Sequence, residues 1–206
     1  MATLFYGQAR LILRTKLAHL ISNGLSPLVI GLLIIALLSL HGSAGAIDAL
    51  KWFFLVTALI VLPVLAISIY MVKTGRMDSL FSNRRHQRHR IYVIGLFFDV
   101  LSIWILTLMN APLILIAGLV AGLASVVFFA FINLWWKISV HSSTIAAFVT
   151  LLFILYGWWA AFSLVLLPLM WWARVNLAQH TFAQVLVGSA LSIVIMLVVF
   201  SQYGIL

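Results

Sequence analysis

The first thing this sequence lacks is charge. Only 7% of its 206 residues are charged, and the acidic side chains are three aspartates, Asp48, Asp78 and Asp99. Three scattered carboxylates are too few for a magnesium site, which is built from oxygen ligands held close together. Cysteine is absent, so disulfides are excluded. We therefore expect no metal site and no disulfide framework, and nothing in the sequence calls for a cofactor.

Apolar residues are abundant instead. They make up 66% of the chain, and the mean hydropathy is +1.25. Soluble domains are nearer half apolar, so this composition indicates a membrane protein. Because one span needs roughly 20 residues, the length allows about six or seven spans. The sequence thus predicts an all-α polytopic membrane protein, with six to seven transmembrane helices in one bundle and residues 1–206 forming a single transmembrane domain.

The apolar runs set the expected order of the spans. Residues 1–20 are mixed in character, and we expect a helix that lies at the membrane interface. The sixth span is the shortest, because Trp159 to Trp171 covers only about 18 Å as α-helix, so we expect it to be short or irregular. The seven expected spans are about 21–40, 50–72, 91–109, 113–134, 142 to a turn near Tyr156 and Gly157, from that turn to 173, and 182–200.

The polar segments between these spans fall on one side of the membrane. Loops after the second, fourth and sixth spans share the face of the N-terminus, and they hold the basic stretch 73–90, the cluster 137–141 and the cluster 174–180. All lysines and arginines except Lys51 lie on this face, which the positive-inside rule places in the cytoplasm. The net charge of +9 favours membrane lipids with anionic headgroups as partners, rather than nucleic acid.

The last cluster has the residue types of a phosphoryl-transfer site. His180 and Gln184 are four residues apart and share one helix face. A hydrogen-bonding side chain can hold a histidine in one tautomer, and such a histidine can attack phosphorus. The planar guanidinium of Arg174 suits a phosphoryl group.

The middle cluster supplies complementary groups. His141 can donate a proton to a leaving oxygen, and it follows Lys137 and Ser139 at the start of a predicted helix. The structural alternative is that His141 and His180 are interfacial residues that cap helices, and that Arg174 extends towards the lipid headgroups.

These clusters resemble the signature of the type 2 phosphatidic acid phosphatase and vanadium haloperoxidase superfamily, K-x6-R-P, P-S-G-H and S-R-x5-H-x3-D. The third motif matches at Arg174 and His180, whereas Ala173 replaces Ser and Gln184 replaces Asp. Residues 138–141 carry the second motif through Ser139 and His141. The chain looks like a divergent bacterial branch of these membrane phosphatases. Its H-T-x-x-Q ending is also similar to that of dolichyl diphosphate phosphatases.

The first motif departs most from the pattern. Arg84 and Arg88 supply arginines without the spacing of K-x6-R-P, and two predicted spans separate them from the second motif. Lys137 stands four residues before His141, where it could provide the missing lysine charge. The resemblance covers mainly residues 73–190, the expected phosphatase-like core.

The resemblance implies a metal-independent lipid phosphate phosphatase in the bacterial inner membrane, and the charge distribution puts its site on the cytoplasmic face. Its substrate would be an isoprenoid diphosphate or a phosphatidate. It assigns the nucleophile that forms a phosphohistidine to His180, the orienting group to Gln184 and the proton donor to His141. The phosphate-binding residues would be Arg174, Lys137, Ser139, Arg84 and Arg88.

Two other functions remain open at this point. A relative that binds lipid phosphates without turnover would keep the basic pocket while the altered motifs abolish catalysis. A transporter or proton relay is suggested by Asp99 inside the third span, since an acid at membrane depth is a functional hypothesis by default. No paired, glycine-broken spans accompany Asp99 to support this alternative.

Overall fold

The computed structural model describes the backbone of residues 2–80 and 84–206, and the side chains of residues 11–80, 84 and 86–206. This part of the chain is helical and contains no strand. Six of its segments are long and apolar enough to cross a membrane. The prediction of an all-α polytopic membrane protein is confirmed. The elements are α1 (Ala2–Gly24), α2 (Pro27–Gly42), α3 (Ala46–Val56), η1 (Thr57–Val61), α4 (Leu62–Lys73), α5 (Arg85–Leu108), α6 (Leu113–Ile132), α7 (Val140–Tyr156), η2 (Gly157–Val165), α8 (Leu166–Asn176) and α9 (Phe182–Gln202).

The described chain forms two compact units, whereas the sequence analysis treats it as one domain. The first unit contains Met1–Ile30 and Ile138–Ile193. The second unit contains Gly31–Lys137 and Val194–Leu206. Two of the three polar clusters therefore lie largely in the first unit. One of them contains His141, and the other contains Arg174 and His180. The basic stretch 73–90 is in the second.

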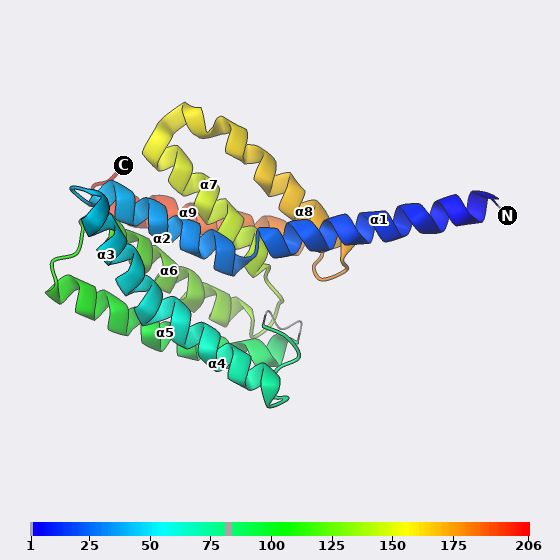
Figure 1. The fold of residues 1–206 in the computed structure, drawn as a ribbon, viewed down its shortest axis with the longest axis horizontal. Coiled ribbons are helices and arrows are strands. Elements are labelled where there is room, and N and C mark those ends of the chain that lie inside the picture. The colour runs from blue at the N-terminus through cyan, green and yellow to red at the C-terminus, as the bar shows by residue number, and fades with distance from the viewer. Residues whose placement is uncertain (1, 81–83) are drawn as a thin grey trace. The chain divides into compact units, whose positions relative to one another are not determined.

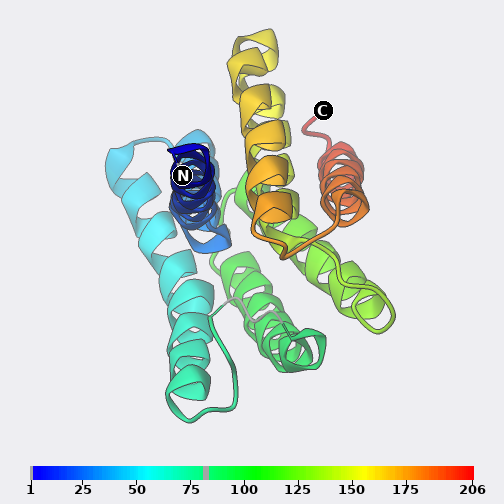
Figure 2. The ribbon, with the colours of Figure 1, turned by 90° about the vertical axis from the view of Figure 1, so that its right-hand side faces the viewer.

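A helical hairpin forms the centre of the first unit (Figures 1 and 2). The chain reverses at Gly157, whose φ of 58° lies in the left-handed region, and α7 then packs against both η2 and α8. The predicted turn at Tyr156 and Gly157 is confirmed. The predicted irregular span is confirmed too, because η2 is a 3₁₀-helix. With a rise of about 2.0 Å per residue in that stretch, Trp159 to Trp171 covers about 21 Å instead of 18 Å.

Helix α1 completes the first unit by packing along α8. It continues to Gly24, beyond the interfacial helix expected at 1–20. Its buried face carries small residues spaced four apart, Ala18 and Ser22, followed by Ser26 just after the helix. Small side chains at this spacing allow two helices in a membrane to approach closely.

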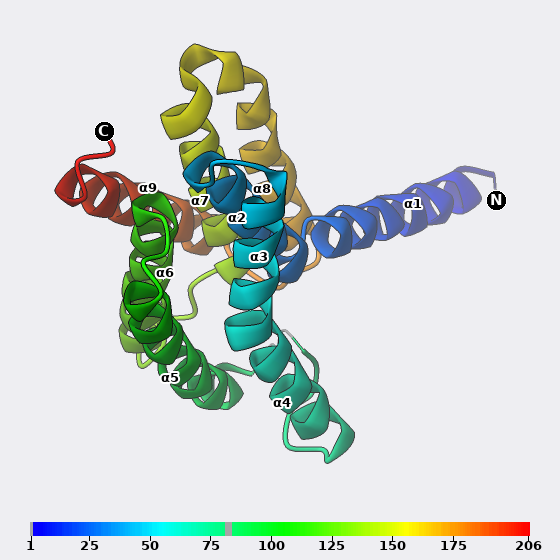
Figure 3. The ribbon, with the colours of Figure 1, turned by 60° about the vertical axis from the view of Figure 1, so that its left-hand side comes forward.

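In the second unit, α3 and α4 run antiparallel to α5, which follows them in the chain (Figure 3). Helices α3 and α4 form one run that the π-helix η1 interrupts just before Pro63. Proline cannot donate a backbone hydrogen bond and its ring crowds the preceding turn, so a wider turn relieves the clash. Helix α5 packs against η1, α4 and α6.

Helices α5 and α6 form a hairpin around the predicted turn at residues 110–112. Asn110 has a φ of 55°, and Pro112 precedes the first residue of α6. Gly118 of α6 lies against Leu38 of α2, because a Cβ atom at this glycine would come within 2.2 Å of Leu38 Cδ1.

Helix α5 begins at Arg85, six residues before the span expected at 91–109. The end of the basic stretch is therefore helical.

Candidate functional site in the first unit

One backbone turn joins Arg174 to His180. Ala178 adopts a left-handed φ of 52°, and its N–H donates to the carbonyl of Val175 over 2.9 Å. The N–H groups of Gln179 and His180 donate to the carbonyl of Arg174, over 3.2 and 3.4 Å. The bonds donated by Ala178 and Gln179 are those of a Schellman C-cap, which ends α8. The R-x5-H spacing thus equals the length of this turn, which holds the two residues together.

A capping box follows directly. The N–H of Thr181 donates to Gln184 Oε1 over 3.1 Å, and the N–H of Gln184 donates to Thr181 Oγ1 over 3.3 Å. This reciprocal pair is the T-x-x-Q form of the motif that starts a helix, here α9. Gln184 therefore has a structural role that does not depend on catalysis.

The same glutamine oxygen sets the tautomer of His180. Nδ1 of the ring lies 3.1 Å from Gln184 Oε1. A backbone N–H can only donate, so the contact with Thr181 identifies the side-chain atom of Gln184 as its oxygen. Oxygen in an amide accepts hydrogen bonds, hence His180 Nδ1 is the donor. In the neutral ring Nε2 then carries the lone pair, which is the tautomer a histidine nucleophile needs.

Arg174 lies inside the first unit. Its side chain is 4% exposed, and Nη1 donates a hydrogen bond to Ser22 Oγ of α1 over 2.8 Å. An arginine that extends to the lipid headgroups would keep its guanidinium near the surface. The structure instead places the guanidinium between α8 and α1, where it forms a buried positive charge beside the turn that carries His180.

The start of α7 brings His141 into the same unit. His141 is in the first turn of α7 and is 4% exposed. Ser139 is the N-cap, and its Oγ accepts the N–H of Ser142 over 3.4 Å and lies 3.0 Å from Ser142 Oγ. The hydroxyl predicted to bind phosphate therefore serves as a helix cap here.

A glycine allows α7 and α9 to touch. A Cβ atom at Gly188 would come within 2.9 Å of both Ser139 O and Ser143 Oγ. The Ser143 hydroxyl lies 2.8 Å from Ser139 O and 3.0 Å from Gly188 O, and so ties the two helices together. Since Gly188 is eight residues after His180, this contact lies roughly two helical turns along α9.

A second polar link adds α8 to this contact. Trp171 Nε1 donates to Ser189 Oγ over 2.9 Å. The Ser189 hydroxyl lies 2.9 Å from Val185 O and 3.3 Å from Ser142 O. Helices α7, α8 and α9 are thus connected by hydrogen bonds just inside the segment that carries the two histidines.

The remaining predicted phosphate ligands belong to the second unit. Arg84 is exposed and directly precedes α5, whereas Arg88 and Lys137 are half-buried. Close to this basic helix start, Asn133 Nδ2 lies 3.5 Å from a ring nitrogen of His89. The hydrogen-bonded site of the first unit therefore consists of Arg174, His180 and Gln184, with His141 in the same unit.

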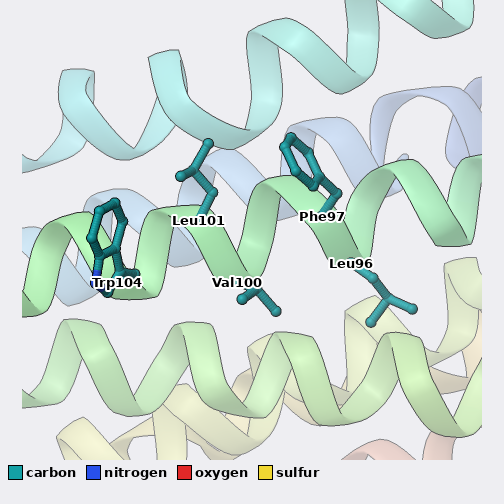
Figure 4. Close-up of a pocket in the computed structure, with 5 residues that line it drawn as sticks. All are labelled: Leu96, Phe97, Val100, Leu101 and Trp104. Carbon is teal, nitrogen blue, oxygen red and sulfur yellow. The ribbon is translucent and has the colours of Figure 1, made fainter.

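One groove in the second unit is apolar. It has a volume of about 450 Å³, and all of its lining side chains come from α5 (Figure 4). Phe97, Val100 and Trp104 in this lining are more than half exposed. No charged side chain lines this groove, so it offers nothing to hold a phosphate. In the described part of the chain, no three His, Cys, Asp or Glu side chains are grouped to hold a metal ion.

Three residues of the site were not identified from the sequence. The T-x-x-Q pattern at Thr181 does signal a capping box and could have been found. Gly188 and Ser22 give no such signal, because their importance depends on which helices pack together. No family model, curated protein or solved structure matches this chain.

Proposed function

We propose that this chain is an integral membrane phosphatase that removes phosphate from a lipid phosphomonoester or diphosphate through a phosphohistidine at His180. The observation that carries the proposal is the shared acceptor Gln184 Oε1, 3.1 Å from both Thr181 N and His180 Nδ1. It holds the ring in the nucleophilic tautomer. Buried Arg174, fixed six residues earlier by the Schellman turn, supplies the positive charge that a phosphoryl group requires.

The proposed reaction has two steps. His180 Nε2 attacks phosphorus, the bond from phosphorus to the leaving oxygen breaks, and His141 gives that oxygen a proton. Water then attacks the phosphohistidine, His141 takes a proton from the water, and the bond from phosphorus to nitrogen breaks to release phosphate. Arg174 stabilises the charge that develops on the equatorial oxygens in both steps. Because Gln184 is neutral, it orients the imidazolium without neutralising its charge.

The substrate class follows from where the site is. A multi-pass membrane protein with a phosphoryl site at the ends of its spans is suited to substrates whose tails stay in the bilayer. Within this class we favour an isoprenoid diphosphate over a phosphatidate, because the His180–Gln184 segment resembles that of dolichyl diphosphate phosphatases. The distribution of lysine and arginine favours a site on the cytoplasmic face of a bacterial inner membrane.

Phosphate release from purified protein tests the proposal. Detergent-solubilised wild-type protein is given isoprenoid diphosphate, isoprenoid monophosphate and phosphatidate in the presence of EDTA. We expect phosphate release that vanadate inhibits competitively, because vanadate adopts the five-coordinate geometry of the transition state. His180→Ala should abolish release, and rapid acid-free quenching of wild-type protein with labelled substrate should trap phosphohistidine.

Two results would contradict this function. Full activity of His180→Ala would show that another group is the nucleophile. Binding of lipid phosphates without any release by the wild-type protein would favour the non-catalytic lipid-binding alternative. His89→Ala serves as the matched control, because this histidine belongs to the second unit and has no role in the proposed reaction.

A further inference from the structure

We infer that Ser22 of α1 is a positioning residue for Arg174, so that the N-terminal helix is part of the phosphoryl-binding machinery. The inference rests on the proposed function and extends it beyond residues 73–190, the only part of the chain that the motifs cover. Ser22 and Arg174 are 152 residues apart in sequence, and the hydrogen bond between them is 2.8 Å long.

Both members of this pair are buried. Ser22 is 2% exposed and Arg174 is 4% exposed. A guanidinium is planar and donates in fixed directions, so a bond to one of its nitrogens restricts the orientation of the whole group. The Ser22 hydroxyl accepts from one nitrogen, Nη1, and thereby restricts how the guanidinium can turn.

The position of Ser22 is itself fixed by packing. Helix α1 packs along α8, and the fully buried Ala18 lies one turn before Ser22 on the same face. The backbone of Arg174 is held from the other side, because its carbonyl accepts the N–H groups of Gln179 and His180. Arg174 is therefore fixed at its backbone by the turn to His180 and at its guanidinium by α1.

If Ser22 orients Arg174, substrate binding depends on the orientation of the guanidinium as well as on its charge. An arginine that binds the phosphoryl group only by its charge would tolerate a change of orientation. An arginine that must present two donors to the phosphoryl oxygens would lose affinity when its orientation is released, even though its charge remains. Ser22 would then affect substrate binding without touching the substrate.

Substitution of Ser22 tests the inference. We expect Ser22→Ala to raise KM and the vanadate inhibition constant together by about tenfold, the scale of one lost hydrogen bond to a charged group. The amount of trapped phosphohistidine at saturating substrate should change little, whereas the melting temperature should fall because a buried donor of a charged group loses its partner. Ser22→Thr, which keeps the hydroxyl, should restore both constants to within about threefold of wild type. Ser26→Ala is the packing control, because Ser26 is also buried and follows Ser22 by four residues.

A double-mutant cycle shows whether Ser22 acts through Arg174. In an Arg174→Lys background the charge is kept but Nη1 is gone, so Ser22→Ala should have no further effect on either constant. An undiminished effect in that background would overturn the inference. So would a loss of melting temperature in Ser22→Ala with unchanged KM and vanadate inhibition, since that is the result of a purely structural bond.

The outcomes separate this inference from the proposed function. If wild-type protein binds vanadate without releasing phosphate, the catalytic proposal fails, and Ser22 is then tested by the vanadate dissociation constant of the same variants. Weaker vanadate binding by Ser22→Ala alone would support the positioning role. If wild-type protein neither binds vanadate nor releases phosphate, both conclusions are overturned.

Discussion

In the first unit several buried polar side chains are hydrogen-bonded from helix to helix, whereas the second unit buries a carboxyl group that lacks such a bond. Arg174 is bonded to Ser22, Ser143 lies between two backbone carbonyls and Ser189 accepts from Trp171. In the second unit Asp99 is 7% exposed, and no donor among the described residues reaches its Oδ1.

The difference shows which unit holds its polar groups in defined positions. A catalytic group must keep its orientation, and hydrogen bonds to neighbouring helices provide this. The surroundings of Asp99 provide fewer hydrogen bonds that could hold its carboxyl group in one orientation. Gly122 on the neighbouring α6 leaves room beside Oδ2. In the same unit, the buried hydroxyl of Thr57 in η1 also has no hydrogen-bond partner in the described chain. The geometry therefore favours chemistry in the first unit over a proton relay at Asp99.

Of these changes Gly188→Ala should produce the largest effect, because it separates α7, which carries His141, from α9, which begins just after His180. The new methyl group would lie 2.9 Å from the backbone carbonyl of Ser139, which cannot move as a flexible side chain could. We expect a loss of about 1–3 kcal/mol in stability from overpacking, together with loss of most of the phosphate release. Thermal unfolding in detergent and a phosphate assay measure the two effects.

The matched control is Gly95→Ala in α5 of the second unit. Nothing lies within 4 Å of a Cβ atom at that helical glycine. Stability should stay the same or rise by up to about 1 kcal/mol, since alanine favours helix more than glycine does. Equal losses in the two variants would mean that the α7–α9 contact is not specially tight.

Gln184 variants should have the next largest effect, and they sharpen the account of the His180 tautomer. Gln184→Ala removes the acceptor for both Thr181 N–H and His180 Nδ1, so we expect turnover to fall by about 10- to 100-fold and α9 to lose about 1 kcal/mol of capping stability. Nitrogen-15 NMR of the histidine rings should show a mixture of tautomers in this variant.

Acidic replacements of Gln184 should act in the opposite direction. Gln184→Glu keeps the reach of the side chain and adds a charge that stabilises the imidazolium, and Gln184→Asp introduces the residue of the S-R-x5-H-x3-D pattern. We expect both to preserve or raise turnover. A Gln184→Ala protein with normal turnover and one tautomer would contradict the assigned role.

Asp99→Asn should change phosphate release by less than about twofold, because the proposed general acid–base and nucleophilic chemistry uses only groups of the first unit. The same preparation assayed with His180→Ala gives the contrast. Loss of activity in Asp99→Asn together with normal activity in His180→Ala would reverse the comparison between the units. It would also restore the proton-relay interpretation of α5.

Ala178→Gly should have the smallest effect and should stabilise the protein. Ala178 adopts a left-handed φ of 52°, which costs an alanine about 1 kcal/mol relative to glycine. We expect a higher melting temperature with unchanged turnover. Ala190→Gly, at an exposed helical position of α9, should instead lower stability by about 1 kcal/mol. If both variants change the stability in the same direction, strain at the Schellman turn is ruled out.

Local sequence determined much of this protein. Long apolar runs dictate membrane-spanning helices, because backbone polar groups in a bilayer must be satisfied within the helix itself. The turns at Gly157 and at Asn110 and the irregular stretch after Gly157 follow from patterns of a few residues. His180 and Gln184 were expected as neighbours on one helix face, but His180 precedes the capping box that starts α9 and meets Gln184 from the turn. The start of α5 was misplaced because arginines and histidines 85–90, although helical, are too polar to be counted in a span.

Tertiary structure alone decided which residues support the site. Nothing in the sequence distinguishes Ser22 from other serines, or Gly188 from other helical glycines. Their roles follow from the packing of α1 on α8 and of α7 against Gly188. The division into two units, which assigns Lys137, Arg84 and Arg88 to a different unit from His180, was equally absent from the motifs. Contacts of this kind join residues far apart in the chain, and apolar helices carry little periodic signal to say which faces meet.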